Sequence, residues 1–152
     1  MNQLALLAIA SGGAIALQAS MNAQLGVLLK NAMLATSVAF LCSCLFMVAA
    51  LLAATKHYPQ WQEVRAVPVY LWFSGGALSA FGVAMFYYLI PKMGVGSMMS
   101  YALSGQIIIA VLASHFGWFD LPVKPLSLVK LIGAATLILG VFLLNLEPSN
   151  GH

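Results

Sequence analysis

Five long stretches of nearly uninterrupted apolar residues follow one another along the chain. They cover about residues 4–26, 32–54, 67–90, 96–116 and 126–146. Each is close to the roughly 20 residues that an α-helix needs to cross the hydrocarbon core of a bilayer. The pattern predicts an all-α integral membrane protein, with five transmembrane helices in a single transmembrane domain over residues 1–152.

The composition agrees with this pattern. Of the 152 residues, 62% are hydrophobic and 6% are charged, and the mean hydropathy is +0.99, far from the values of a soluble domain. Every charged residue falls between the apolar runs or at their edges. The acidic and basic side chains that usually couple transport to protons or ions are therefore missing at mid-membrane depth.

Other classes of function find little support in the residues. No Ser-His-Asp set, glycine-rich phosphate loop or pair of intramembrane carboxylates is present, which argues against an enzyme. His57 and His115 are far apart in sequence, and Cys42 and Cys44 point to nearly opposite helix faces, which disfavours a metal site. The six basic residues are scattered, so no nucleic-acid-binding patch forms. We expect no catalytic residue, metal, cofactor or nucleic acid.

The basic residues give a weak signal for orientation. Five spans would place the two termini on opposite sides of the membrane, and basic residues favour the cytoplasmic side. The side of the N-terminus receives Lys56, Arg65, Lys124 and Lys130, whereas the other side receives Lys30 and Lys92. Two interpretations stay open. In one, the chain has a fixed orientation with its N-terminus in the cytoplasm. In the other, it inserts both ways (dual topology) or pairs with an oppositely oriented sister chain, as in inverted-repeat transporters.

A polar stripe runs along the first apolar run. Ser11, Ile15, Gln18 and Asn22 are spaced by four, three and four residues and so share one helix face. A carboxamide without partners is costly in hydrocarbon, so Gln18 and Asn22 must face other helices or a water-filled cavity. They are either interhelical hydrogen-bonding groups or part of a substrate path.

The fourth run carries a second polar face. It is formed by Ser97, Ser100, Tyr101 and Ser104, with His115 on its continuation, whereas Gln106 points to the opposite face. Small hydroxyl residues also let helices pack closely, which is the simpler explanation for each serine. The Tyr101 hydroxyl is harder to explain by packing because it needs a partner.

The third and fifth runs carry small residues. On the third, a shared face is small in the middle and aromatic at its ends: Trp72, Gly76, Ser79, Val83 and Phe86. Gly75 and Gly76 admit a neighbouring backbone or a ligand, with packing the safer interpretation, and Trp72 is an interfacial anchor or lies at a cavity mouth. Gly133 and Gly140, with Thr136, indicate a packing or dimer helix.

The longest connection and the tighter one between the third and fourth runs differ in character. Residues 55–68, "TKHYPQWQEVRAVP", suit an interfacial loop because they mix aromatic and charged residues. In "LIPKMGVG", Pro91 can end one helix, and Gly94 and Gly96 allow a sharp return.

Several of these motifs resemble a known family. Residues 74–144 resemble one half of a drug/metabolite transporter. "GGAIALQASMNAQLG" near the N-terminus, "LSGQ" around Gln106 and "SHFGWF" around His115 are similar to the short YdcZ-like branch. The resemblance spans nearly the whole chain.

The resemblance implies an architecture and a location. Full-length relatives have ten helices in two inverted halves, so this chain would be one half, completed by an antiparallel copy or by a homologous subunit. The family's polar positions fall here on Gln18, Asn22 and Gln106. "HFG" stands where many relatives have a glutamate, which counts against proton-coupled export of cations. A bacterial inner membrane is the implied location.

Together these observations predict a transporter that moves a small polar or amphipathic metabolite by alternating access within the lipid bilayer. Gln18 and Asn22 would hydrogen-bond the substrate, Tyr101 and the serines would form a facing wall, and Trp72 would close one end. Two alternatives remain: a non-transporting membrane subunit, and a proton-coupled exporter of drug-like compounds that uses His115 or a partner's carboxylate.

Overall fold

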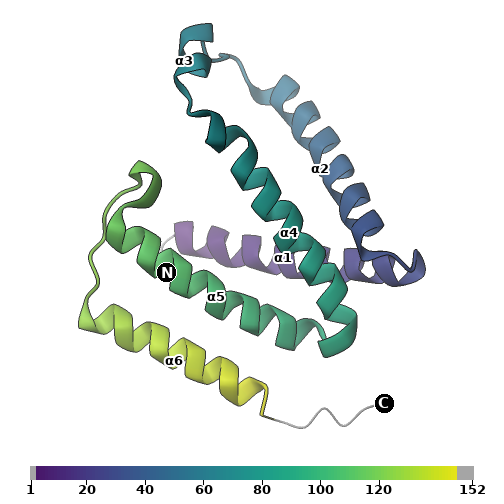
Figure 1. Cartoon of the computed structure of the whole chain (residues 1–152), viewed down its shortest axis with the longest axis vertical. Coiled ribbons are helices and arrows are strands. Elements are labelled where there is room, and N and C mark those ends of the chain that lie inside the picture. Colours follow the sequence, from purple (N-terminus) through teal and green to yellow (C-terminus); the bar gives the residue numbers. More distant parts are fainter. Residues whose placement is uncertain (1–2, 147–152) are drawn as a thin grey trace. The chain divides into compact units, whose positions relative to one another are not determined.

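The computed structural model describes residues 3–146, so the two ends of the predicted domain, residues 1–2 and 147–152, lie outside the described part. The described chain is all-helical (Figure 1). Its elements are α1 (Gln3–Leu28), α2 (Ala32–Ala54), α3 (Trp61–Ala66), α4 (Val69–Met93), α5 (Val95–Phe116), η1 (Trp118–Asp120) and α6 (Leu128–Leu144).

Within residues 3–146, four helices are long and apolar enough to cross a membrane, namely α1, α2, α4 and α5. The last helix, α6, is apolar but has 17 residues, which gives a length of about 25 Å at 1.5 Å per residue. That is shorter than the roughly 30 Å hydrocarbon core. The structure therefore gives four long apolar helices and a shorter one, and the prediction that all five cross the membrane stays a prediction.

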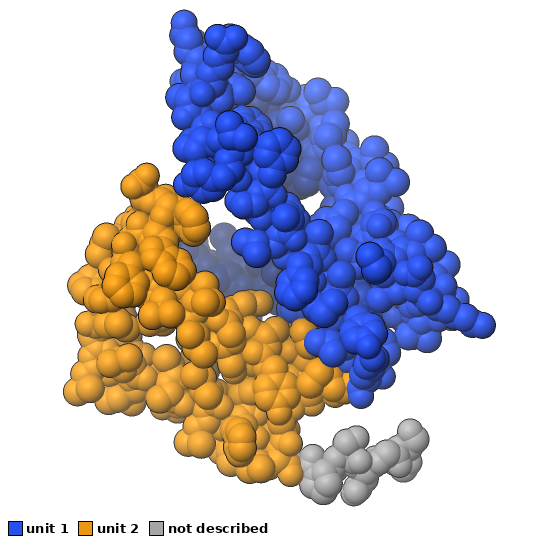
Figure 2. Space-filling view, in the orientation of Figure 1, with its two compact units in different colours: residues 1–92 blue, residues 93–152 orange. Residues whose placement is uncertain are grey.

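The chain divides into two compact units, residues 1–92 and residues 93–152, shown in two colours in Figure 2. Each unit is described by itself. The first contains α1, α2, α3 and nearly all of α4, and the second contains α5, η1 and α6.

In the first unit, α1 and α2 are joined by a tight turn. The N–H groups of Lys30 and Asn31 donate to the carbonyls of Val27 (3.1 Å) and Gly26 (2.9 Å), which is a Schellman arrangement with Lys30 in the left-handed position at φ 51°. The Asn31 side chain then caps α2 by accepting from the N–H of Leu34 at 3.0 Å. The two helices consequently reverse direction within three residues.

Small residues let α1 and α2 approach closely beside this turn. A Cβ added at Gly26 would lie 3.3 Å from the Cα of Ala32 and 3.5 Å from the Cβ of Ala35. Ala19, Ala23 and Gly26, spaced by four and three residues, are buried on one face of α1. This is the small-residue packing typical of membrane helices.

The connection between α2 and α4 contains a helix that the sequence did not predict. At the start of α3, the N–H of the capping residue Gln60 donates to the Glu63 carboxylate at 2.7 Å, and the Arg65 guanidinium lies 5.0 Å from the centre of the Trp61 ring. Pro91 also behaves differently from the expectation. It lies inside α4, where its missing N–H removes one helical hydrogen bond, and the helix continues two residues further, to Met93.

In the second unit, α5 and α6 form an antiparallel hairpin. At one end, residues 117–127 form the α5–α6 connector, which begins with Gly117 at φ 61° as the cap of α5. The N–H of Lys124 donates to the carbonyl of Ser114 (2.8 Å), and the N–H of Leu126 donates to His115 Nδ1 (3.2 Å). At the other end, Asn145 Nδ2 donates to Ser100 Oγ (2.9 Å) and to the carbonyl of Val141 (2.7 Å).

Candidate functional site

The long-range polar contacts of the first unit meet at one tyrosine. Gln18 Nε2 and Asn22 Nδ2 donate to Tyr87 Oη at 2.7 Å and 3.0 Å. The two carboxamides lie four residues apart on α1 and so share a face, whereas Tyr87 comes from α4. Gln18, Asn22 and Tyr87 are called the carboxamide–tyrosine cluster below.

Burial differs strongly within the cluster. Tyr87 is 1% exposed, Asn22 is half-buried and Gln18 is exposed. A tyrosine hydroxyl can accept two hydrogen bonds and donate one, and both acceptor positions are used here. Among the described residues, the hydroxyl hydrogen and the two carboxamide oxygens have no hydrogen-bond partner and can bond a ligand. The cluster thus offers donors and acceptors without charge, and Gln18 gives it an open side.

Tyr87 also lines a hollow at the α1–α2 turn. This hollow of about 190 Å³ is bounded by Gly26, Val27, Lys30, Asn31, Ala32, Tyr87, Tyr88 and Pro91. The Lys92 ammonium lies 3.5 Å from the centre of the Tyr88 ring, a cation–π contact at the same end of α4. The neutral cluster is therefore continuous, through Tyr87, with a hollow that reaches Lys30 at the helix end.

Two serines on the polar face of α5 donate to carbonyls of their own helix, unlike the carboxamides of α1. Ser100 Oγ donates to the carbonyl of Ser97 at 2.9 Å, and Ser104 Oγ donates to the carbonyl of Ser100 at 3.2 Å. Tyr101 is 48% exposed and Gln106 is exposed. Ser97 and Ser100 line a hollow of about 270 Å³ with Met93, Gly94, Gly96, Leu144 and Asn145. The two serines are thus brought together with Asn145 within the second unit.

The glycines predicted to pack lie on open surfaces. Within residues 3–146, a Cβ added at Gly75, Gly76, Gly133 or Gly140 would meet no atom within 4 Å. Trp72, on the same helix as Gly75 and Gly76, is 56% exposed. Packing at these glycines needs a further chain and stays a prediction.

The sequence reasoning missed Tyr87 and Asn145. A signal for Tyr87 was present, because Ser79, Val83 and Tyr87 are spaced by four and share a helix face. Asn145 had no such signal, since it lies just past the end of α6. His115 acts in this structure as an acceptor that holds the α5–α6 connector.

Long apolar helices, with polar side chains that bond between helices, define a helical integral membrane protein. A family model described as "Putative inner membrane exporter, YdcZ" matches residues 3–143, and the chain belongs to this family. The resemblance seen in the sequence is thereby confirmed, and the protein is an inner membrane protein of a family of exporters rather than enzymes. No curated protein and no solved structure matches the chain.

Proposed function

We propose that this protein exports a small polar or amphipathic metabolite, with the carboxamide–tyrosine cluster lining the substrate path. The observation that carries the proposal is the pair of hydrogen bonds from Gln18 and Asn22 to the buried Tyr87 hydroxyl. These bonds hold two carboxamides on one face, with spare donors and acceptors, at the level of the membrane where polar groups are costly.

The chemistry of the cluster selects a class of substrate. All three members are neutral, so they match a neutral or zwitterionic solute better than a bare ion. A solute could replace the internal hydrogen bonds with its own and leave no buried polar group unpaired. Direct release along a gradient is the simplest mechanism, because no Asp, Glu, Lys or Arg lies at mid-depth of the apolar runs to couple flux to protons.

The assembly we propose is an antiparallel pair, either two copies or this chain with a homologous subunit. The described chain buries few hydrophobic side chains, which are Ala19, Ala23, Ala35, Tyr87, Ile90, Met98 and Val141. The open glycine faces of α4 and α6 would admit the second chain. Two such chains would make the ten-helix inverted repeat that the resemblance implies, with α6 as a short fifth span.

The test of transport uses purified protein in liposomes. Efflux is measured for radiolabelled zwitterionic amino acids, neutral sugars and polyols, with and without a pH gradient. Gln18→Leu with Asn22→Leu should lower the flux of any transported solute by about tenfold or more, since two substrate hydrogen bonds are each worth about 1 kcal/mol. Gln24→Leu is the matched control, because Gln24 is an exposed carboxamide of α1 outside the cluster.

The outcomes of the flux assay distinguish the proposed exporter from a non-transporting subunit and from a proton-coupled exporter. Flux that persists in the double variant, together with altered assembly, would make the carboxamides interhelical contacts only. Flux that requires a pH gradient would favour the proton-coupled alternative. The same assay tests the contributions that the sequence assigns to Trp72, Ser97, Ser100, Tyr101, Ser104 and Gln106.

The test of assembly is the location of the C-terminus. Reporters that are active in the cytoplasm or outside are fused after His152 in cells that express this chain alone. Signal from both sides supports an antiparallel pair of identical chains. Signal from one side means a fixed orientation, and a homologous partner of opposite orientation must then be sought.

A further inference from the structure

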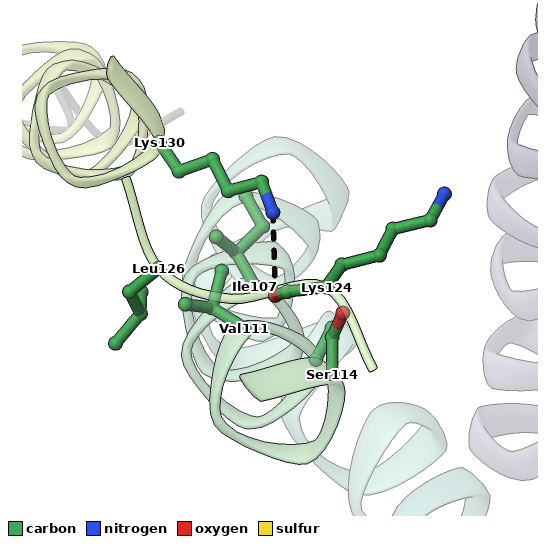
Figure 3. Close-up of a pocket in the computed structure, with 7 residues that line it drawn as sticks. Ile107, Val111, Ser114, Lys124, Leu126 and Lys130 are labelled. Carbon is green, nitrogen blue, oxygen red and sulfur yellow. Dashed lines mark hydrogen bonds between the residues drawn. The ribbon is translucent and has the colours of Figure 1, made fainter. Parts of the chain in front are cut away.

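A hollow at the connector end of the α5–α6 hairpin combines an apolar wall with two cations. It has a volume of about 310 Å³ and is lined by Ile107, Ala110, Val111, Ser114, Lys124, Leu126 and Lys130 (Figure 3). The apolar residues of α5 extend along the helix, whereas Ser114 and both lysines lie at its connector end. The hollow is therefore apolar along α5 and polar at its connector end.

A second hollow shares part of this lining. It has a volume of about 400 Å³ and adds Ala113, Leu121 and Pro122 to the shared Ala110, Ser114 and Lys124. The polar residues of both hollows are thus Ser114 and lysine, and the remainder are apolar. The polar residues that the two hollows share are therefore one serine and one lysine.

The position of Lys130 favours an anion. Its ammonium donates to the carbonyls of Pro125 (2.8 Å) and Lys124 (3.3 Å), and within residues 3–146 one of its three N–H groups has no acceptor. Lys130 lies in the first turn of α6, where the positive end of the helix dipole disfavours a cation. A bound anion would offset this repulsion and would also interact with the dipole itself.

The charges of the α5–α6 connector also favour an anionic ligand. Asp120 is the single acidic residue of residues 117–127, against Lys124 in the connector and Lys130 just after it. Figure 3 shows the Lys130 side chain reaching back to the connector, while the Lys124 side chain extends away from it. Lys124 is exposed, so its long side chain is free to turn toward a ligand.

Aromatic residues place this end of the hairpin at the membrane interface. Phe116 and Trp118 stack with their ring centres 6.5 Å apart, and Trp118 and Phe119 are 41% and 66% exposed. Exposed aromatic residues beside a membrane helix end are typical of the headgroup region. The cationic end of the hollow then lies at the depth of lipid phosphates, and its apolar part lies beside the acyl chains.

We propose that this hollow binds an anionic phospholipid. The phosphate would bind Lys130 and Lys124, with the Ser114 hydroxyl as a further donor, and an acyl chain would lie along Ile107 and Val111. Basic pockets between membrane helices bind anionic headgroups in this way. The apolar walls favour a lipid over a free phosphate, because a free phosphate has no acyl chain that could pack against them. The proposal does not depend on the transport function.

Lipid retention by the purified protein tests the proposal. Protein in detergent is equilibrated with equimolar phosphatidylglycerol and phosphatidylcholine, and bound lipid is counted by native mass spectrometry. Wild-type protein should retain phosphatidylglycerol preferentially, and Lys124→Gln with Lys130→Gln should weaken that retention by about fivefold per lysine. The matched control is Lys56→Gln with Arg65→Gln, which removes equal charge on the same predicted side and should leave retention unchanged.

Each result of the lipid-retention experiment either supports or overturns the proposed lipid site. Equal retention of the two lipids, or an equal loss in the control variant, would overturn the proposal. Val111→Trp fills the apolar part and keeps both lysines, so it should lower phosphatidylglycerol retention in a protein whose charge is unchanged. Glycerol 3-phosphate should not displace the lipid at equal concentration; displacement would mean that a free phosphate is the ligand.

Discussion

The polar stripes of the two units look alike in sequence and behave differently in the structure. In the first unit, the carboxamides of α1 bond across to Tyr87 on α4, 65 and 69 residues away. In the second unit, the hydroxyls of Ser100 and Ser104 donate to carbonyls of their own helix, three and four residues back. One stripe ties helices together, and the other is largely satisfied within its own helix.

The difference follows from side-chain chemistry. A serine hydroxyl is short enough to bond the carbonyl of the preceding turn, so a serine on a membrane helix needs no distant partner. A carboxamide has two donors and an acceptor that its own helix does not satisfy, so it must find a partner elsewhere. A stripe of carboxamides is therefore stronger evidence for a polar site than a stripe of serines.

The largest effect on stability is expected for Tyr87→Phe. It removes the acceptor of both carboxamides and should lower the free energy of unfolding by about 1–2 kcal/mol, measured by denaturation in mixed micelles. Tyr88→Phe is the control, since Tyr88 is exposed and adjacent. If the two variants lost equal stability, the first unit would not depend on the cluster.

Asn145→Ala should have a smaller effect. It removes the bonds from Asn145 Nδ2 to Ser100 Oγ and to the carbonyl of Val141, at the open end of the α5–α6 hairpin. The expected loss is about 0.5–1 kcal/mol in the same assay, because this end is half-buried. A loss as large as that of Tyr87→Phe would remove the contrast between the two units.

The smallest effect is expected for Ser104→Ala. The serine hydroxyl bonds only its own helix among the described residues, and alanine is the better helix former. The free energy of unfolding should therefore change by less than about 0.5 kcal/mol. A larger loss would show that Ser104 has a partner in the assembled protein, as a facing wall would require.

Much of the fold follows from the sequence because membrane helices are encoded by long apolar runs. The all-helical class and the need of Gln18 and Asn22 for a partner both follow from local composition. The identity of that partner does not follow from the sequence, because Tyr87 is distant from both carboxamides along the chain and its aromatic ring is typical of a lipid-facing side chain. The shortness of α6 was also missed, because Leu126 and Leu146 continue the apolar run beyond the helix ends.

Water access to the cluster is the most direct test of the central claim that it lines a substrate path. Single cysteines are placed at Gln18, Asn22 and Leu17 in a Cys42→Ser and Cys44→Ser background, and labelling with a membrane-impermeant charged thiol reagent is followed in intact membranes. Thiolates form in water and not in hydrocarbon, so Gln18→Cys and Asn22→Cys should react about tenfold faster than Leu17→Cys. Equal, slow labelling at all three positions would mean that the carboxamides only join helices, which would contradict the proposed path.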